Sequence, residues 1–263
     1  MGPFKDIGVE KTTGHVALVE IRRPPHNYFD IALIRELATA FEVLDADPGC
    51  RALVLAAQGK AFCAGANFGD DDRDGSALLG GPTPGAAHLY IEGNRLFRTE
   101  KPIVAAVHGA AVGGGLGLAM VADFRVTCAE ARFSANFTRL GFHPGFGLSV
   151  TLPVVIGQTK AALMFYTSRR IAGDEAFAMG LVDLLVPQEQ VRSAALSLAT
   201  EIAENSPLGL IATRATLRGN LADRVRAATE HELAEQMRLR KTDDFKEGVK
   251  AMAERRVPNF TSR

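Results

Sequence analysis

The chain has 263 residues, of which 47% are hydrophobic and 23% are charged, enough apolar material for one large core. Its 30 basic and 30 acidic residues cancel to a net charge of zero, which gives no support to a nucleic-acid or membrane-surface partner. Its apolar stretches are too short and too glycine-broken to span a bilayer, and its first residues lack the core of a signal peptide. Three scattered cysteines without metal-ligand spacing favour a cytoplasmic protein with no metal.

The first third of the chain predicts strands alternating with helices. A hairpin-like start around residues 15–21 precedes a helix over residues 30–44, which Asp30 caps and whose apolar residues recur at helical spacing. A strand follows at residues 52–56. The polar, glycine- and proline-rich stretch 69–84, which includes the acidic run Asp70–Asp74, is expected to form a mobile loop beside the site.

Beyond residue 85 the pattern continues and then becomes mostly helical. A helix near residues 86–98 leads to a strand at 103–107, and further short strands are expected at 122–128 and 132–134. Helices are predicted at 159–167, 174–179, 190–205, 207–219 and 224–240. No linker separates independent domains, so the natural boundary divides a core of residues 1–200 from a helical region of residues 201–263.

Two glycine-containing loops, each directly after an apolar strand, carry the strongest functional signal. Gly113, Gly114 and Gly115 follow the strand at 103–107 and open an apolar helix, where free backbone N–H groups point outward. The loop containing Ala64 and Ala66 follows the strand at 52–56 in the same way. Together, the two loops can place two N–H groups around one carbonyl oxygen, which is an oxyanion hole. The glycine spacing does not fit a dinucleotide-binding loop.

The order and spacing of these motifs resemble the crotonase family, the enoyl-CoA hydratase/isomerase superfamily, over nearly the whole chain. The matching segments are Ala61-Phe62-Cys63-Ala64-Gly65-Ala66, Lys101-Pro102, His108-Gly109, Gly113-Gly114-Gly115, Leu140-Gly141, Pro144-Gly145, Gly180-Leu181-Val182-Asp183 and Glu247-Gly248. The resemblance implies an α/β fold in which ββα units wind into a spiral, with a C-terminal helical region for trimerisation. It also implies a coenzyme A thioester as ligand, no permanently bound cofactor, and a homotrimer or a homohexamer.

The resemblance assigns binding roles to residues of both loops. It implies that the thioester oxygen lies between the N–H groups of Ala66 and Gly114. It places the phosphates and adenine of coenzyme A near Arg23 and Ala64, while a C-terminal stretch around residues 245–255 reaches a neighbouring subunit's nucleotide. Phe137, with Phe142 and Phe146, is expected to line an apolar acyl pocket or to pack the core, and Asn136 and Arg139 to meet a polar acyl group.

The chain departs from the family pattern at the residues that move protons. Hydratases of the family carry one glutamate two residues after the glycine turn and a second four residues after the phenylalanine that matches Phe133; here these positions are Gly117 and Phe137. Neither residue can transfer a proton, so ordinary hydration of crotonyl-CoA is in doubt. His143, a few residues further on, is the best substitute base, although the favoured interpretation is that it caps or packs the turn before Pro144.

Three functional hypotheses stay open at this point. The first is an enzyme of the lyase or isomerase type that stabilises a thioester enolate and uses a relocated base such as His143. The second is a catalytically weak acyl-CoA-binding protein that keeps the fold and the oxyanion hole. The third, a structural oligomer without a ligand, leaves the two matched loops unexplained. His88 and the acidic run Asp70–Asp74 are further candidate bases, although both fit a solvent-facing role.

Overall fold

The computed structural model describes residues 4–67 and 89–263. Its larger sheet has the strand order β1-β2-β3-β5-β7-β10, in which only β1 and β2 pair antiparallel. Its smaller sheet has the order β4-β6-β8-β9. The strands of the first sheet are β1 (Ile7–Lys11), β2 (Val16–Ile21), β3 (Ala52–Ala57), β5 (Ile103–Val107), β7 (Phe124–Thr127) and β10 (Leu184–Leu185). Those of the second are β4 (Ala61–Cys63), β6 (Ala110–Val112), β8 (Arg132–Ser134) and β9 (Ile171–Ala172).

The chain passes repeatedly from the larger sheet to the smaller one. β3 is followed by β4, β5 by β6, and β7 by β8, and each successive strand pairs in parallel with its predecessor in the same sheet. This repetition winds the chain into the crotonase spiral, an α/β fold, as the sequence predicts. Because β4, β6 and β8 lie side by side, the loops that follow them are gathered at one edge of the smaller sheet.

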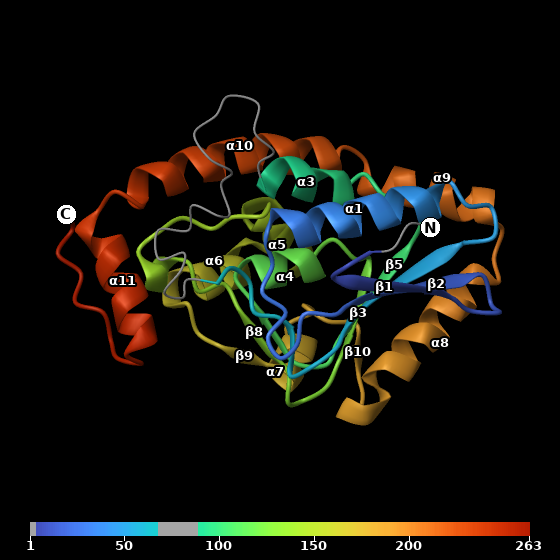
Figure 1. The fold of residues 1–263 in the computed structure, drawn as a ribbon, viewed down its shortest axis with the longest axis horizontal. Coiled ribbons are helices and arrows are strands. Elements are labelled where there is room, and N and C mark those ends of the chain that lie inside the picture. Colours follow the sequence, from blue (N-terminus) through green and yellow to red (C-terminus); the bar gives the residue numbers. More distant parts are fainter. Residues whose placement is uncertain (1–3, 68–88) are drawn as a thin grey trace.

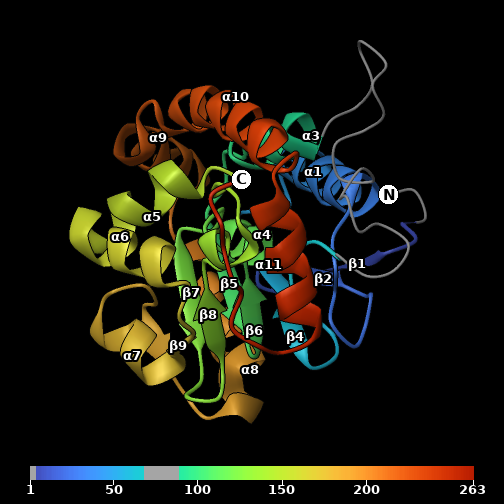
Figure 2. The same cartoon turned by 90° about the vertical axis from the view of Figure 1, so that its left-hand side faces the viewer.

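Helices cover both faces of the larger sheet (Figures 1 and 2). On one side α1 (Ile31–Asp45) contacts β1 and β2, and α3 (Leu89–Leu96) packs between α1 and α10 (Leu221–Leu239). On the other side α8 (Val191–Ala203) contacts β2, β3, β5 and β7. The remaining helices are α4 (Gly114–Ala119), α5 (Leu148–Ile156), α6 (Gln158–Thr167), α7 (Gly173–Ala178), α9 (Pro207–Arg218) and α11 (Asp243–Ala253), with short 3-10 turns η1 (Thr138–Leu140) and η2 (Gln188–Gln190).

The predicted cap and apolar face of α1 are both present. The carboxylate of Asp30 accepts a hydrogen bond from the amide of Leu33 at 2.9 Å, which satisfies one of the unpaired N–H groups of the first turn. The apolar side chains of this helix that recur at helical spacing are completely or almost completely buried: Leu33, Ile34, Leu37, Phe41 and Leu44. Burial of this stripe against the sheet fixes the helix beside the N-terminal hairpin.

A partly buried ion-pair cluster ties the C-terminal helices to the spiral. Asp123, just before β7, accepts from Arg214 at 2.8 Å and from Arg218 at 2.9 Å, both on α9, and also from the amide of Ile103. The boundary predicted at residue 200 falls inside α8, which continues to Ala203. The division into two regions therefore stays a prediction, whereas the contact between α9 and the sheet is direct.

The predicted loop at residues 69–84, with its acidic run Asp70–Asp74, and His88 lie outside the described residues. No helix in the described ranges is both long enough and apolar enough to cross a membrane. Within the same ranges, no group of three or more His, Cys, Asp or Glu side chains is arranged to hold a metal ion.

Candidate active site

The backbones of the loops after β4 and β6 lie in close contact. Gly65 has a left-handed φ of +79°, and a Cβ at this position would lie 2.6 Å from the carbonyl oxygen of Val112 and 3.5 Å from the amide nitrogen of Gly114. A Cβ at Gly115 would in turn lie 2.0 Å from the carbonyl oxygen of Cys63. Only glycine permits both approaches. The two loops are therefore adjacent, as the sequence predicts.

The amide of Gly114 begins α4 and has no carbonyl partner within that helix, because the first N–H groups of a helix never do. The preceding Gly113 has a φ of +55°, and its own amide donates to the carbonyl of Ser134 at 2.8 Å. Across the gap, the carbonyl of Gly65 accepts from the amide of Phe29 at 3.0 Å, which fixes the loop that carries Ala66. Ala64, Ala66 and Gly114, three of the predicted site residues, line one pocket.

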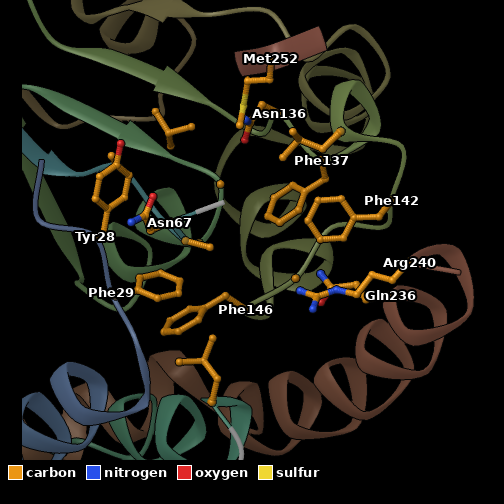
Figure 3. A pocket seen from close by; sticks show the side chains of 18 of the residues that line it. Tyr28, Phe29, Asn67, Asn136, Phe137, Phe142, Phe146, Gln236, Arg240 and Met252 are labelled. Atoms are coloured by element: carbon orange, nitrogen blue, oxygen red, sulfur yellow. The ribbon is translucent and has the colours of Figure 1, made fainter. Parts of the chain in front are cut away.

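This pocket has a volume of about 350 Å³ and is walled mainly by aromatic side chains (Figure 3). Its far end is polar, because Gln236 and Arg240 reach it from α10. The guanidinium of Arg240 lies 5.8 Å from the ring centres of both Phe142 and Phe245. The aromatic residues of the wall are Tyr28, Phe29, Tyr90, Phe137, Phe142 and Phe146. Such a cavity suits an apolar or planar acyl group.

Phe146 fills the space that a side chain at residue 117 would need. A Cβ built on Gly117 would lie 2.9 Å from the Cβ and the Cδ1 of Phe146. Phe146 is 2% exposed, has a left-handed φ of +60°, and its ring centre lies 5.4 Å from that of Phe29. The ring also packs against the rings of Tyr90 and Phe97, each with a distance of 6.5 Å between ring centres. The absence of a side chain at residue 117 is thus matched by an aromatic ring packed into the same space.

Phe137 lies in the pocket wall and is 6% exposed. Its ring meets that of Phe142 edge to face at 5.6 Å between centres. Phe137, Phe142 and Phe146 line the pocket and also belong to the buried core, so both of the roles considered for them from the sequence are present. Among the described residues that line this pocket there is no carboxylate and no imidazole.

The structure does not place His143 in the pocket lining. Its Nδ1 lies 2.8 Å from the carbonyl oxygen of Pro144, and its ring meets the ring of His231 edge to face at 5.6 Å. Its own carbonyl accepts from the side-chain amide of Gln236 at 2.9 Å. The ring is therefore turned toward α10, and the chain segment, rather than the imidazole, borders the pocket.

Arg23 also lies outside the pocket lining, although its neighbour in the turn, Tyr28, is part of it. The guanidinium pairs with Asp6 at 2.5 Å and with Asp30 at 2.9 Å. These two carboxylates raise the pKa of Arg23 against the opposing effect of its partial burial. Arg23 thus fixes the N-terminal turn beside the pocket, and its predicted contact with the nucleotide stays a prediction.

α10 supplies site residues that the sequence pattern does not reveal. The hydroxyl of Tyr90 donates to the side-chain oxygen of Gln236 at 2.9 Å, across 146 residues of sequence. Desolvation raises the pKa of Tyr90, so its phenol stays protonated at neutral pH. Neither Tyr90 nor Gln236 belongs to a local motif, and their pairing depends on the packing of α10 against α3, which no short-range pattern contains.

A buried carboxylate on the same helix holds the turn that carries Phe146. Glu232 is fully buried and accepts from the amide of Gly147 at 2.8 Å and from the hydroxyl and amide of Ser149 at 2.5 and 3.2 Å. Desolvation raises its pKa, while these hydrogen bonds oppose the rise. Glu232 therefore acts as a cap for the first turn of α5 from a distant helix.

Cys63 lies next to the loop that carries Ala64 and Ala66 but has no exposed surface. Burial raises the pKa of its thiol to about 12, so the thiolate is scarce at neutral pH. It acts as a small packing residue.

A spiral of ββα units with two glycine loops at the mouth of an apolar pocket is the architecture of a crotonase-type protein. The chain belongs to the enoyl-CoA hydratase/isomerase family, whose sequence pattern matches residues 11–263. It is similar to mevalonyl-coenzyme A hydratase of Beauveria bassiana, with 35% identity over 253 residues that cover 93% of this chain and 90% of the relative. It is 30% identical over 262 residues to the mitochondrial Delta(3,5)-Delta(2,4)-dienoyl-CoA isomerase of Homo sapiens, covering 95% and 80% of the two chains.

Its fold is also similar to solved structures. The crystal structure of an enoyl-CoA hydratase/isomerase from Pseudoalteromonas atlantica matches with a TM-score of 0.86 and 27% identity, over 98% of this chain and all of the other. The family and the fold implied by the sequence motifs are therefore confirmed.

Proposed function

We propose that the protein binds a coenzyme A thioester with the carbonyl oxygen between the N–H groups of Ala66 and Gly114. These donors would stabilise the negative charge that develops on the oxygen when the thioester becomes an enolate. The observation that supports the proposal is the close backbone approach of the loops at Gly65 and Gly115, because it brings Ala66 and Gly114 to the wall of one pocket. Ala64 and Arg23 would lie along the coenzyme A moiety, and no permanently bound cofactor is required.

The reaction that follows activation differs from ordinary hydration. Gly117 and Phe137 occupy the positions that hold glutamates in hydratases of the family, and the described pocket wall offers no carboxylate in their place. General acid–base catalysis contributes a factor of roughly 10²–10⁴, so crotonyl-CoA should be hydrated slowly. Relatives named as a hydratase and as an isomerase support a lyase or isomerase acting on a CoA thioester.

The proposed enzyme needs a general base to move the proton at Cα. His143 remains the candidate, although its ring faces α10, so that a change of its side-chain rotamer or a bound water would have to connect it to the substrate. His143→Gln tests it, because the amide keeps a hydrogen-bonding side chain of similar size but cannot accept the proton. Loss of turnover with unchanged thioester affinity would support His143 as the base. Unchanged turnover would exclude His143 from that role.

The second candidate function is a catalytically weak acyl-CoA-binding protein. It is favoured by one observation, the two aromatic residues Phe137 and Phe146 at the places where acid–base groups are expected. Incubating the purified protein with a panel of CoA thioesters and following their masses separates the two functions. A changed mass or retention time of any thioester indicates an enzyme, whereas binding without conversion indicates a binding protein.

The oxyanion hole is tested by Gly114→Pro, with Gly114→Ala as the matched control. Both add a Cβ, which would meet the far end of the Phe29 ring at 2.1 Å, but only proline removes the N–H. Proline also suits the first position of a helix, so α4 should persist. Relative to alanine, we expect proline to lower turnover by roughly 10²–10³. Equal activity of the two variants, or failure of any acyl-CoA to bind the wild-type protein, would contradict the proposal.

A further inference from the structure

A second pocket opens beside the acyl pocket, between the smaller sheet and α11. Its volume is about 980 Å³, against about 350 Å³ for the acyl pocket. The two pockets share Val112, Asn136 and Met252 in their walls, so they lie directly beside each other. β6 and β8 form its floor, η1 and the segment before β9 its side, and the C-terminal end of α11 its cover.

The second pocket is strongly basic. Among the described residues, six arginines and no carboxylate line it, although the whole chain carries equal numbers of basic and acidic residues. Arg169 pairs with Glu175 at 3.3 Å, and Arg256 pairs with Glu247 and Glu254. Within the described ranges, Arg139, Arg170 and Arg255 have no carboxylate at ion-pair distance. Such an excess of one sign in a cleft attracts an anion.

Hydrogen bonds hold two of the arginine-bearing segments together. The hydroxyl of Ser168 lies 2.8 Å from the Thr138 hydroxyl and accepts from the amide of Arg139 at 3.1 Å. Arg139 on η1 and Arg170 before β9 thus come from segments joined at a defined position. Arg23, by contrast, already has carboxylates on both arms of its guanidinium. An anionic ligand therefore finds more uncompensated positive charge beside α11 than at the N-terminal turn.

We propose that this arginine pocket binds the anionic end of the same CoA thioester whose carbonyl lies at Ala66 and Gly114. The inference rests on the proposed function and names a second binding site for that ligand. Guanidinium groups bind phosphate and carboxylate oxygens with two parallel hydrogen bonds, so two parts of the ligand carry suitable chemistry. One is the phosphates of the coenzyme A nucleotide, which the larger volume suits, and the other is a carboxylate at the far end of the acyl group.

The test compares four thioesters on the full-length protein by isothermal titration calorimetry. Butyryl-CoA, butyryl-pantetheine, glutaryl-CoA and glutaryl-pantetheine vary the phosphates and the acyl carboxylate independently. The test variant is the double substitution Arg139→Gln/Arg170→Gln, which removes two exposed charges without opening the core. Arg224→Gln on α10 is the matched control, because Arg224 is also exposed but lies outside both pockets.

If the pocket binds the phosphates, the double variant should bind both CoA thioesters about ten- to a hundredfold more weakly and butyryl-pantetheine as before. The salt dependence of CoA-thioester binding should fall as well. If the pocket binds the acyl carboxylate, the loss should follow the glutaryl group in both the CoA and the pantetheine series. Either result supports an anion site and identifies its ligand.

Unchanged affinity for all four thioesters, or an equal loss that includes butyryl-pantetheine, would overturn the inference. Failure of the oxyanion hole gives a different result. In that case Gly114→Pro would bind and turn over the pantetheine thioesters as well as Gly114→Ala does, whatever the effect of the two arginines.

Discussion

Replacing Gly117 by glutamate, which restores one family carboxylate, should destabilise the protein rather than create a hydratase. The new Cβ would lie 2.9 Å from the Cβ of Phe146, an atom that cannot move without its backbone. Overpacking of this kind costs about 1–3 kcal/mol, and an unpaired buried polar group adds about 1–3 kcal/mol. A total near 4 kcal/mol should lower the Tm by roughly 10 °C for a chain of this size.

The assay is urea-induced unfolding in a cycle of Gly117→Glu, Phe146→Gly and their combination. Glycine at residue 146 removes the ring and suits the φ of +60°, so the glutamate should cost about 2 kcal/mol less in that background. Gly93→Ala is the control, because its Cβ would meet the same ring only at the outer edge, at 3.2 Å, and not at the backbone-anchored Cβ. The Gly93→Ala substitution should change the free energy of unfolding very little.

The same variants should be assayed for hydration of crotonyl-CoA. We expect a gain only in the combined variant, where the carboxylate has room to reach the pocket. If Gly117→Glu alone unfolds at the wild-type urea concentration, or hydrates crotonyl-CoA as well as the combined variant does, the steric reasoning about Phe146 is refuted.

Three further predictions concern catalysis, pH and assembly. The protein should hydrate crotonyl-CoA about 10²–10⁴-fold more slowly than a relative with both glutamates, and a wild-type rate typical of such relatives would contradict this. Phe137→Glu should raise the hydration rate, because the side chain of residue 137 lines the pocket. The pKa of Glu232 is raised in the folded state. In urea titrations the wild type should therefore lose stability relative to Glu232→Gln as the pH rises from about 4.5 through the folded-state pKa, and parallel curves of stability against pH for the two proteins would contradict this. Leu208 and Leu217 on α9 are 78% and 82% exposed, so light scattering should report a trimer or hexamer, and a lone 28.1 kDa species would exclude both.

Much of the fold follows from local patterns in the sequence. The cap at Asp30, the strand at residues 103–107 and the strand at 132–134 are found where predicted, because each depends on a few neighbouring residues. The helix α11 was not predicted, although Thr242 caps it by accepting from the amide of Phe245 at 3.2 Å. Phe245, Val249 and Met252 recur at helical spacing, so the signal for this helix is present in the sequence.

The candidate site was only partly predictable for a different reason. Ala66 and Gly114 belong to loops that the strand order forces together, so motif spacing is enough to place them in one pocket. The ring of Phe146 in the space beside Gly117 depends on a left-handed backbone conformation that a phenylalanine seldom adopts. Likewise, Tyr90 meets Gln236 only because α10 folds back over α3. Long-range packing of this kind leaves no trace in the spacing of residues.

Main-chain atoms of the two loops approach each other closely at Gly65 and Gly115, and in the function we propose this approach sets the spacing of the two N–H donors. The nearest atom that a Cβ at either glycine would meet is a main-chain oxygen, so substitutions in the aromatic wall should leave that spacing unchanged. If the proposed function holds, thioester activation and acyl selection are separable properties in this chain. The aromatic wall could then be redesigned for a new acyl group while the amides of Ala66 and Gly114 keep their positions, provided that both glycines are left in place.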